Sequence, residues 1–132
     1  MTTGHDGSLA TVHASSPRGV VTRLESLASM QQEVARNTLR DQISSGVDVI
    51  VHLEKQSGVR RVANVDVLTP LVVDDRTRVR GYPVFAAPLG SPEPRCFALP
   101  PATLERLNAA GESLKRLPKD FTSVDPGEPW IA

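Results

Sequence analysis

The sequence has few of the residues that whole classes of protein depend on. Its single cysteine, Cys96, excludes an intramolecular disulfide framework and is typical of a reducing cytoplasm. Aromatic residues make up 4 % of the chain, so a core has to be built from Val, Leu, Ile and Ala. No stretch approaches the roughly 20 apolar residues of a membrane-spanning helix, and the polar start has no signal-peptide apolar region.

Neither sign of charge dominates, because 15 Lys and Arg balance 15 Asp and Glu. The sequence therefore gives no indication of the basic face that a nucleic-acid partner usually requires. A net charge of zero also weakens the repulsion between copies of the chain. With 132 residues, of which 39 % are hydrophobic, the composition predicts one small folded domain.

A phosphate-binding loop of the P-loop type is also missing from the sequence. Such a loop reads G-x-x-x-x-G-K-[ST], because its backbone amides surround the phosphates and its lysine reaches the terminal ones. None of the nine glycines is followed by lysine. Residues 71–75, Leu-Val-Val-Asp-Asp, are similar in pattern to the strand and carboxylate that hold Mg²⁺ in such enzymes. A hairpin turn at Asp74 and Asp75 is the better interpretation. We therefore expect no ATP hydrolysis by this chain alone.

Chemically useful side chains are most densely grouped between Gly4 and Arg18. Two glycines bracket His5 and Asp6 and permit a tight turn. The stretch Ser8–His13 has the pattern of a short strand, and Ser16-Pro17 is a helix start with a capping serine and a proline at the first helical position. This order predicts imidazoles near free N–H groups, where a phosphate could bind.

Hydrophobic periodicity gives a coarse outline of the remaining elements. Helices are predicted over 16–30 and 31–45, with Gly46 as a stop, and over 101–117 with a weak point at Gly111. A strand over 47–54, a turn at Ser57-Gly58 and a return strand over 59–68 predict an antiparallel hairpin. Shorter strands are expected over 71–73, 77–80 and 82–86.

The motif at residues 3–18, T-G-H-D-G-S-L-A-T-V-H-A-S-S-P-R, followed by R-L-E at 23–25, resembles the histidine box of type II/IV secretion ATPases. Its pattern is most similar to the CpaF/TadA-type ATPases of pilus assembly and conjugal-transfer-associated export. That family typically shows T-G-H-x-G-S, T-x-H-A-N-S-P and R-L-E, and its Asn is Ser15 here. A weaker resemblance continues through 46–52 and 58–62 to the helix near 101–107.

The resemblance implies an α/β fold, namely the C-terminal portion of a RecA-like P-loop ATPase domain with antiparallel hairpins and a short C-terminal helical appendage. In the family the P-loop and the Walker B strand lie upstream of the histidine box, and residues 1–5 resemble an interior family segment. We therefore expect residues 1–87 to be the C-terminal part of the motor domain. A Pro-rich linker over 88–101, a helical appendage over 102–117 and a flexible tail over 118–132 are expected to follow.

The implied function is ATP-driven work in type II/IV secretion or pilus assembly. His13 and His5 are the implied catalytic residues, with His13 sensing the terminal phosphate of the nucleotide. Arg18, Arg23 and Glu25 are implied to lie beside the nucleotide and the neighbouring subunit. ATP and Mg²⁺ are the implied cofactors, which this chain alone is not expected to bind tightly. The implied partners are further copies in a hexameric ring and an inner-membrane platform protein, at the cytoplasmic face of the membrane.

Other interpretations stay open. The chain could be a non-catalytic fragment that docks on full-length secretion ATPase subunits and regulates them, or a decayed remnant. Taken alone, a histidine such as His13 is more often structural than functional. A metal site formed by His5, Asp6 and His13 is disfavoured, because a spacing of eight between the histidines fits no common zinc pattern. Trp130 is either loosely packed or a docking residue.

Overall fold

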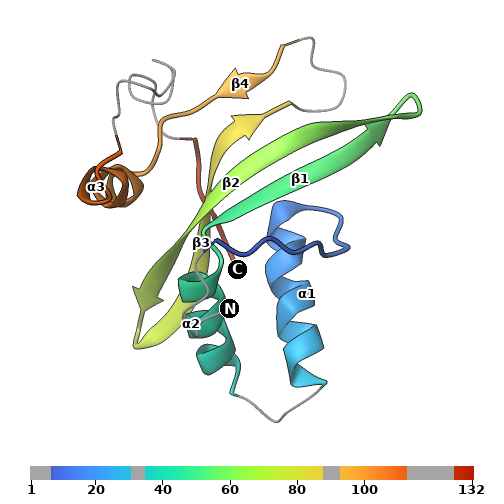
Figure 1. Cartoon of the computed structure of the whole chain (residues 1–132). Coiled ribbons are helices and arrows are strands. Elements are labelled where there is room, and N and C mark those ends of the chain that lie inside the picture. Colours follow the sequence, from blue (N-terminus) through green and yellow to red (C-terminus); the bar gives the residue numbers. More distant parts are fainter. Residues whose placement is uncertain (1–6, 31–34, 88–92, 113–126) are drawn as a thin grey trace. The chain divides into compact units, whose positions relative to one another are not determined.

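The structure, a computed structural model, describes residues 7–30, 35–87, 93–112 and 127–132. These residues form helices and a sheet in which β3 pairs antiparallel with both β4 and β5, which is compatible with the α/β expectation. Figure 1 shows the elements, which in chain order are α1 (Pro17–Ser29), α2 (Arg36–Gly46), β1 (Val49–Gln56), β2 (Val59–Val73), β3 (Arg76–Ala86), β4 (Arg95–Cys96), α3 (Pro101–Ala109) and β5 (Trp130–Ile131).

The strands follow one another in the order β1-β2-β3-β4, and β5 also pairs with β3. Two-residue turns connect the first three strands at Ser57-Gly58 and at Asp74-Asp75. All four turn residues have positive φ, between 49° and 86°, as a type I′ hairpin turn requires. Both turns were predicted, and the interpretation of Asp74-Asp75 as a turn rather than a Mg²⁺-binding strand end is confirmed.

Strand β2 is longer than predicted, because it continues without a break through Thr69 and Pro70. Proline is tolerated in a strand where no neighbour needs its missing N–H. The N–H of Leu68 donates to the carbonyl of Asp48, one residue before β1 begins. Pro70 therefore lies beyond the end of β1, where β2 needs only one partner.

Strand β3 passes through a proline for a similar reason. Its residues Arg80 and Gly81 pair with β5, and Phe85 and Ala86 pair with β4. Pro83 lies between these two paired stretches, so neither pairing needs the N–H that proline lacks.

The chain forms two compact units that alternate along the sequence. Unit 1 comprises Met1–Ile50, Leu68–Gly81 and Trp130–Ala132, and unit 2 comprises Val51–Val67 and Tyr82–Pro129. In unit 1 both helices and the strands contribute to one buried cluster: Val20, Val21, Ile43, Ile50, Leu68 and Val79. In unit 2 the buried apolar residues include Ala63, Val67 and Val84.

The end of the chain is part of a strand rather than the expected flexible tail. Val79 and Ala132 exchange both backbone hydrogen bonds, at 3.3 and 2.9 Å, and Trp130 packs against the core of unit 1. Gly81 makes this possible, because a Cβ there would lie 2.1 Å from Cε2 of the Trp130 indole. Of the expected tail, residues 118–126 lie outside the described residues.

The expected linker over 88–101 likewise contains ordered pairing, since Arg95 and Cys96 form β4. Residues 88–92 of this segment lie outside the described residues.

The helices follow the predicted outline with shifts at their ends. In α1 the buried residues are Pro17, Val20 and Val21, while Leu27 near its end is 40 % exposed. Helix α2 begins at Arg36, and Gly46 is its last residue rather than a stop after it. Helix α3 ends before Gly111, whose φ of +79° is the left-handed conformation that terminates helices.

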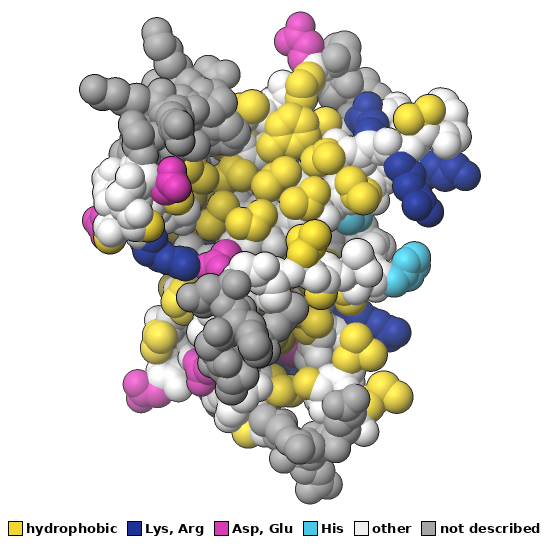
Figure 2. Space-filling model, viewed as in Figure 1, with side chains coloured by type: hydrophobic (Ala, Val, Ile, Leu, Met, Phe, Trp, Pro, Cys, Tyr) yellow, Lys and Arg dark blue, Asp and Glu magenta, His cyan; other side chains and the backbone are white. Residues whose placement is uncertain are grey.

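Hydrophobic side chains also reach the surface. Figure 2 shows many of them on the face that it views. Several belong to strands β1 and β2, among them Val51 and Leu53.

Candidate functional site

The candidate site is a surface depression at the start of α1, in unit 1. It is lined by His13, Ala14, Ser15, Gly19, Thr22, Arg23 and Ser26. Residues 8–14 reach it as an irregular, mostly exposed segment, so the predicted strand Ser8–His13 is not formed. Strands need a hydrogen-bonded neighbour, and no described strand runs alongside this segment.

The start of α1 is capped as the sequence predicted. The Ser16 hydroxyl oxygen accepts a hydrogen bond from the Gly19 N–H at 3.1 Å, and the Ser16 carbonyl accepts one from the Val20 N–H at 3.2 Å. Pro17, in the first helical position, has no N–H. The N–H of Arg18 is therefore the one amide of the first helical turn that is left for a ligand or water. The sequence had suggested several such free N–H groups.

The lining side chains come from one face of α1 and from the segment before it. Gly19, Thr22, Arg23 and Ser26 are spaced at i, i+3, i+4 and i+7, which places them on the same side of the helix. His13, exposed in the preceding segment, lies against this face. A guanidinium, an imidazole and hydroxyl groups together suit an anion such as phosphate, and the positive end of the helix dipole has the same effect.

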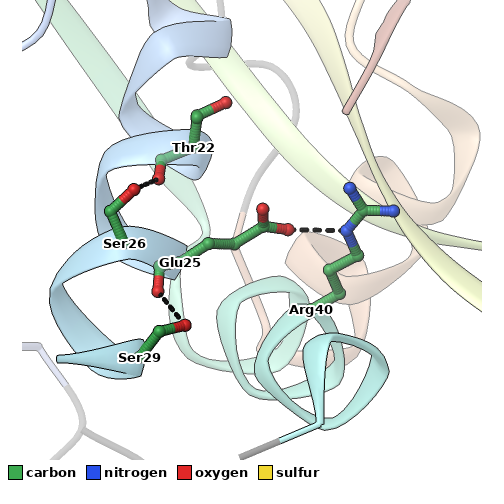
Figure 3. A network of polar contacts seen from close by, with 5 residues as sticks. All are labelled: Thr22, Glu25, Ser26, Ser29 and Arg40. Carbon is green, nitrogen blue, oxygen red and sulfur yellow. Dashed lines mark hydrogen bonds and ion pairs between the residues drawn. The ribbon is translucent and has the colours of Figure 1, made fainter. Parts of the chain in front are cut away.

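Glu25 takes part in a different set of contacts, shown in Figure 3. Its Oε1 lies 2.6 Å from Nε of Arg40, so the pair ties α1 to α2. Both side chains are mostly buried, with exposed fractions of 14 % for Glu25 and 19 % for Arg40. Nearby, the Ser26 hydroxyl donates to the Thr22 carbonyl, and the Ser29 hydroxyl to the Glu25 carbonyl.

The predicted site residues are therefore only partly brought together. His13 and Arg23 share the depression, whereas Arg18 is exposed on α1 and does not line it. Glu25 faces Arg40 on α2 instead of the depression. His5 lies outside the described residues.

Thr22 and Ser26 are lining residues that the sequence analysis did not single out. Helical spacing was the signal that could have found them, because both follow Gly19 at intervals that return to the same face.

Within the described ranges no three His, Cys, Asp or Glu side chains gather closely enough to hold a metal ion. The described helices are all too short or too polar to cross a lipid bilayer.

Comparisons with known proteins agree with the motif. The family model described as "Type II/IV secretion system protein" matches residues 1–72, more than half of the chain. Two Mycobacterium tuberculosis proteins, from strains CDC 1551 and H37Rv, each named "Putative conjugal transfer protein", are 36 % identical to it over 69 residues. That match covers 52 % of this chain but 19 % of each relative, so the chain spans about a fifth of their length. No solved structure matches.

Proposed function

Since the chain belongs to the family of type II/IV secretion system proteins, we propose that it is the C-terminal part of a CpaF/TadA-type ATPase that powers secretion or pilus assembly. In this proposal the depression at the start of α1 belongs to the histidine box. The observation that carries the proposal is that His13 and Arg23, ten residues apart in sequence, line one depression together with hydroxyl groups.

Each lining group has a role that fits a nucleotide phosphate. The Arg23 guanidinium can donate two parallel hydrogen bonds to phosphate oxygens. The His13 imidazole donates one hydrogen bond and responds to whether the terminal phosphate is present. The hydroxyl of Ser15 supplies a further donor in the position where the family has Asn.

The described residues fit the outer side of an ATP site rather than a complete one. ATP would supply the phosphoryl group, with Mg²⁺ neutralising its charge. The carboxylate of Glu25 is bound to Arg40 and does not line the depression. Groups that cradle the phosphates and hold Mg²⁺ must therefore come from a P-loop-bearing segment or subunit, as no glycine here precedes a lysine.

The proposal also covers the partners of this chain and its location in the cell. Arg18, exposed on α1, is available to a carboxylate or phosphate at the edge of a neighbouring subunit in a hexameric ring. The ring would work at the cytoplasmic face of the inner membrane, against a platform protein there.

The first test is the mass of the native product. A tag on the chromosomal gene, placed after Ala132, would report the size of the protein in cells. A product several times heavier than 14.2 kDa supports the motor proposal, because a P-loop then lies on the same polypeptide. A product of that mass favours a second candidate instead, a separate regulatory fragment.

That second candidate rests on the missing phosphate cradle. A chain with the outer half of a nucleotide site can dock on full-length subunits and change their turnover. Adding the purified chain to a full-length secretion ATPase, and measuring both ATP turnover and co-purification, tests this. No co-purification, together with a native mass of 14.2 kDa, would leave only a decayed remnant.

His13 itself is tested in the P-loop-bearing protein. His13→Ala should lower the maximal rate of ATP hydrolysis while ATP still binds, because the imidazole acts on the terminal phosphate. His52→Gln is the matched control, since His52 lies on β1 and does not line the depression. Equal rates for both variants would reject the role of His13.

A further inference from the structure

Residues 8–13, the segment that ends at His13, lie almost entirely in solvent. All of them are exposed, and the apolar Leu9 is 98 % exposed. No described strand pairs with this segment, so a ladder of backbone hydrogen bonds does not fix it. Segments with few buried contacts open easily. The place of the His13 imidazole at the depression therefore depends on the contact that comes next along the chain.

Ala14 makes that contact. It is the first half-buried residue after the exposed stretch, and it packs against the buried cluster of unit 1. A Cβ added at Gly19 would lie 3.8 Å from Cβ of Ala14, which is an ordinary van der Waals distance. The Ala14 methyl group therefore lies beside the first turn of α1, where residue 19 has no side chain.

The two neighbours of Ala14 are turned toward solvent. His13 and Ser15 are exposed, while Ala14 between them is half-buried, and all three line the depression. The inward position of Ala14 thus leaves the imidazole and the hydroxyl on the open side, where an anion can reach them.

We propose that Ala14 is a positioning residue, whose methyl group anchors this segment on α1 and on the buried cluster and so holds the His13 imidazole at the depression. The inference rests on the proposed function for its effect on ATP turnover, but not for the anchoring itself. Glycine at position 14 would lack the anchor and would add backbone freedom, so His13 would spend less time near Arg23.

Nuclear magnetic resonance of the full chain tests the anchoring. In Ala14→Gly the imidazole resonances of His13 should shift toward those of a histidine in an unfolded peptide, and the order parameter of its backbone N–H should fall. Ala10→Gly is the matched control, because Ala10 is an exposed alanine of the same segment, and it should leave both quantities unchanged.

The unaltered chain provides a readout that does not depend on the variants folding. The Ala14 methyl protons should show nuclear Overhauser effects to the α protons of Gly19. Backbone order parameters should rise from Ala10 to Ala14, because the anchor lies at the end of the segment.

ATP turnover of the P-loop-bearing protein shows whether Ala14 acts through His13. Ala14→Gly should lower the maximal rate more than it changes KM for ATP, as is expected of His13→Ala. Added to His13→Ala, it should cost nothing further, because the group that it positions is already gone. A merely structural role would lower the rate by the same factor in both backgrounds.

The two kinds of measurement separate this inference from the proposed function. If His13→Ala leaves the rate unchanged, the proposed function fails, while the resonances of the full chain still decide the anchoring. The inference is overturned by unshifted His13 resonances in Ala14→Gly, by equal shifts in Ala10→Gly, by an Ala14 as mobile as Ala10 in the unaltered chain, or by equal rate losses in both backgrounds.

Discussion

At the scale of single residues, the guanidinium of Arg23 and the imidazole of His13, which both line the depression, are held differently. Arg23 stands on a capped helix, whereas His13 lies in an irregular segment whose position no described strand fixes. The helix therefore fixes the backbone from which the Arg23 guanidinium reaches the depression, where it can stabilise developing negative charge.

Replacing Arg23 should therefore lower catalysis without unfolding the protein. In the P-loop-bearing protein, Arg23→Ala is expected to reduce ATP turnover by about tenfold or more. Arg36→Ala is the matched control, because Arg36 is an exposed arginine on α2 that does not line the depression. Steady-state turnover and circular dichroism of both variants would decide it, and normal turnover in Arg23→Ala would contradict the assignment.

The contact between Glu25 and Arg40 should contribute to stability rather than to chemistry. Glu25→Gln keeps the shape of the side chain but removes its charge from a mostly buried contact, so we expect a loss of about 1–2 kcal/mol in the free energy of unfolding. Urea unfolding of the full chain measures this.

A double-mutant cycle with Arg40→Gln separates the pair from its surroundings. If the two changes are simply additive, the 2.6 Å contact contributes nothing of its own.

At the scale of elements, the beginning of α1 depends on one serine. Ser16→Ala removes the acceptor of the Gly19 N–H and should cost about 1 kcal/mol of stability. Ser29→Ala, at the other end of the same helix, removes an exposed hydroxyl that only bonds back to the Glu25 carbonyl, so it should have little effect. Thermal unfolding of both variants tests this, and equal melting temperatures would argue against the cap.

The pairing of β5 with β3 depends on the absence of a side chain at Gly81. Gly81→Ala would drive a Cβ into the indole of Trp130, so β5 should leave the sheet. Because Trp130 is the only tryptophan, its fluorescence should shift to longer wavelength as the indole enters water.

Repeating the glycine substitution in a variant that lacks the indole makes this prediction specific. With Trp130→Val already in place, adding Gly81→Ala should cost much less stability, because the clash is gone. An equal cost in both backgrounds would show that Gly81 matters for its backbone and not for the room it leaves.

At the scale of the whole molecule, the features set by local chemistry were predictable from the sequence. Ser16-Pro17 determines a helix start, and Ser57-Gly58 and Asp74-Asp75 determine turns, because each depends on a few neighbouring residues. His13 and Arg23, which the dense motif singled out, line the same depression, and their function stays a prediction.

Long-range contacts could not be predicted in this way. The pairing of Trp130 with Gly81, and the contact of Glu25 with Arg40, join residues that no local pattern relates. Asp66 is 1 % exposed although an aspartate in a strand pattern indicates a solvent-facing position. Tertiary packing decides such cases, and one sequence without structure carries no signal for it.

The placement of β5 also has a consequence for the order of events during synthesis. Trp130 and Ala132, which pack on the core of unit 1, are translated only after every residue of unit 2. Unit 1 therefore cannot finish folding while the nascent chain is still growing toward these residues. Until Trp130 and Ala132 have left the ribosome, the part of the apolar cluster that they cover stays open to solvent and to chaperones.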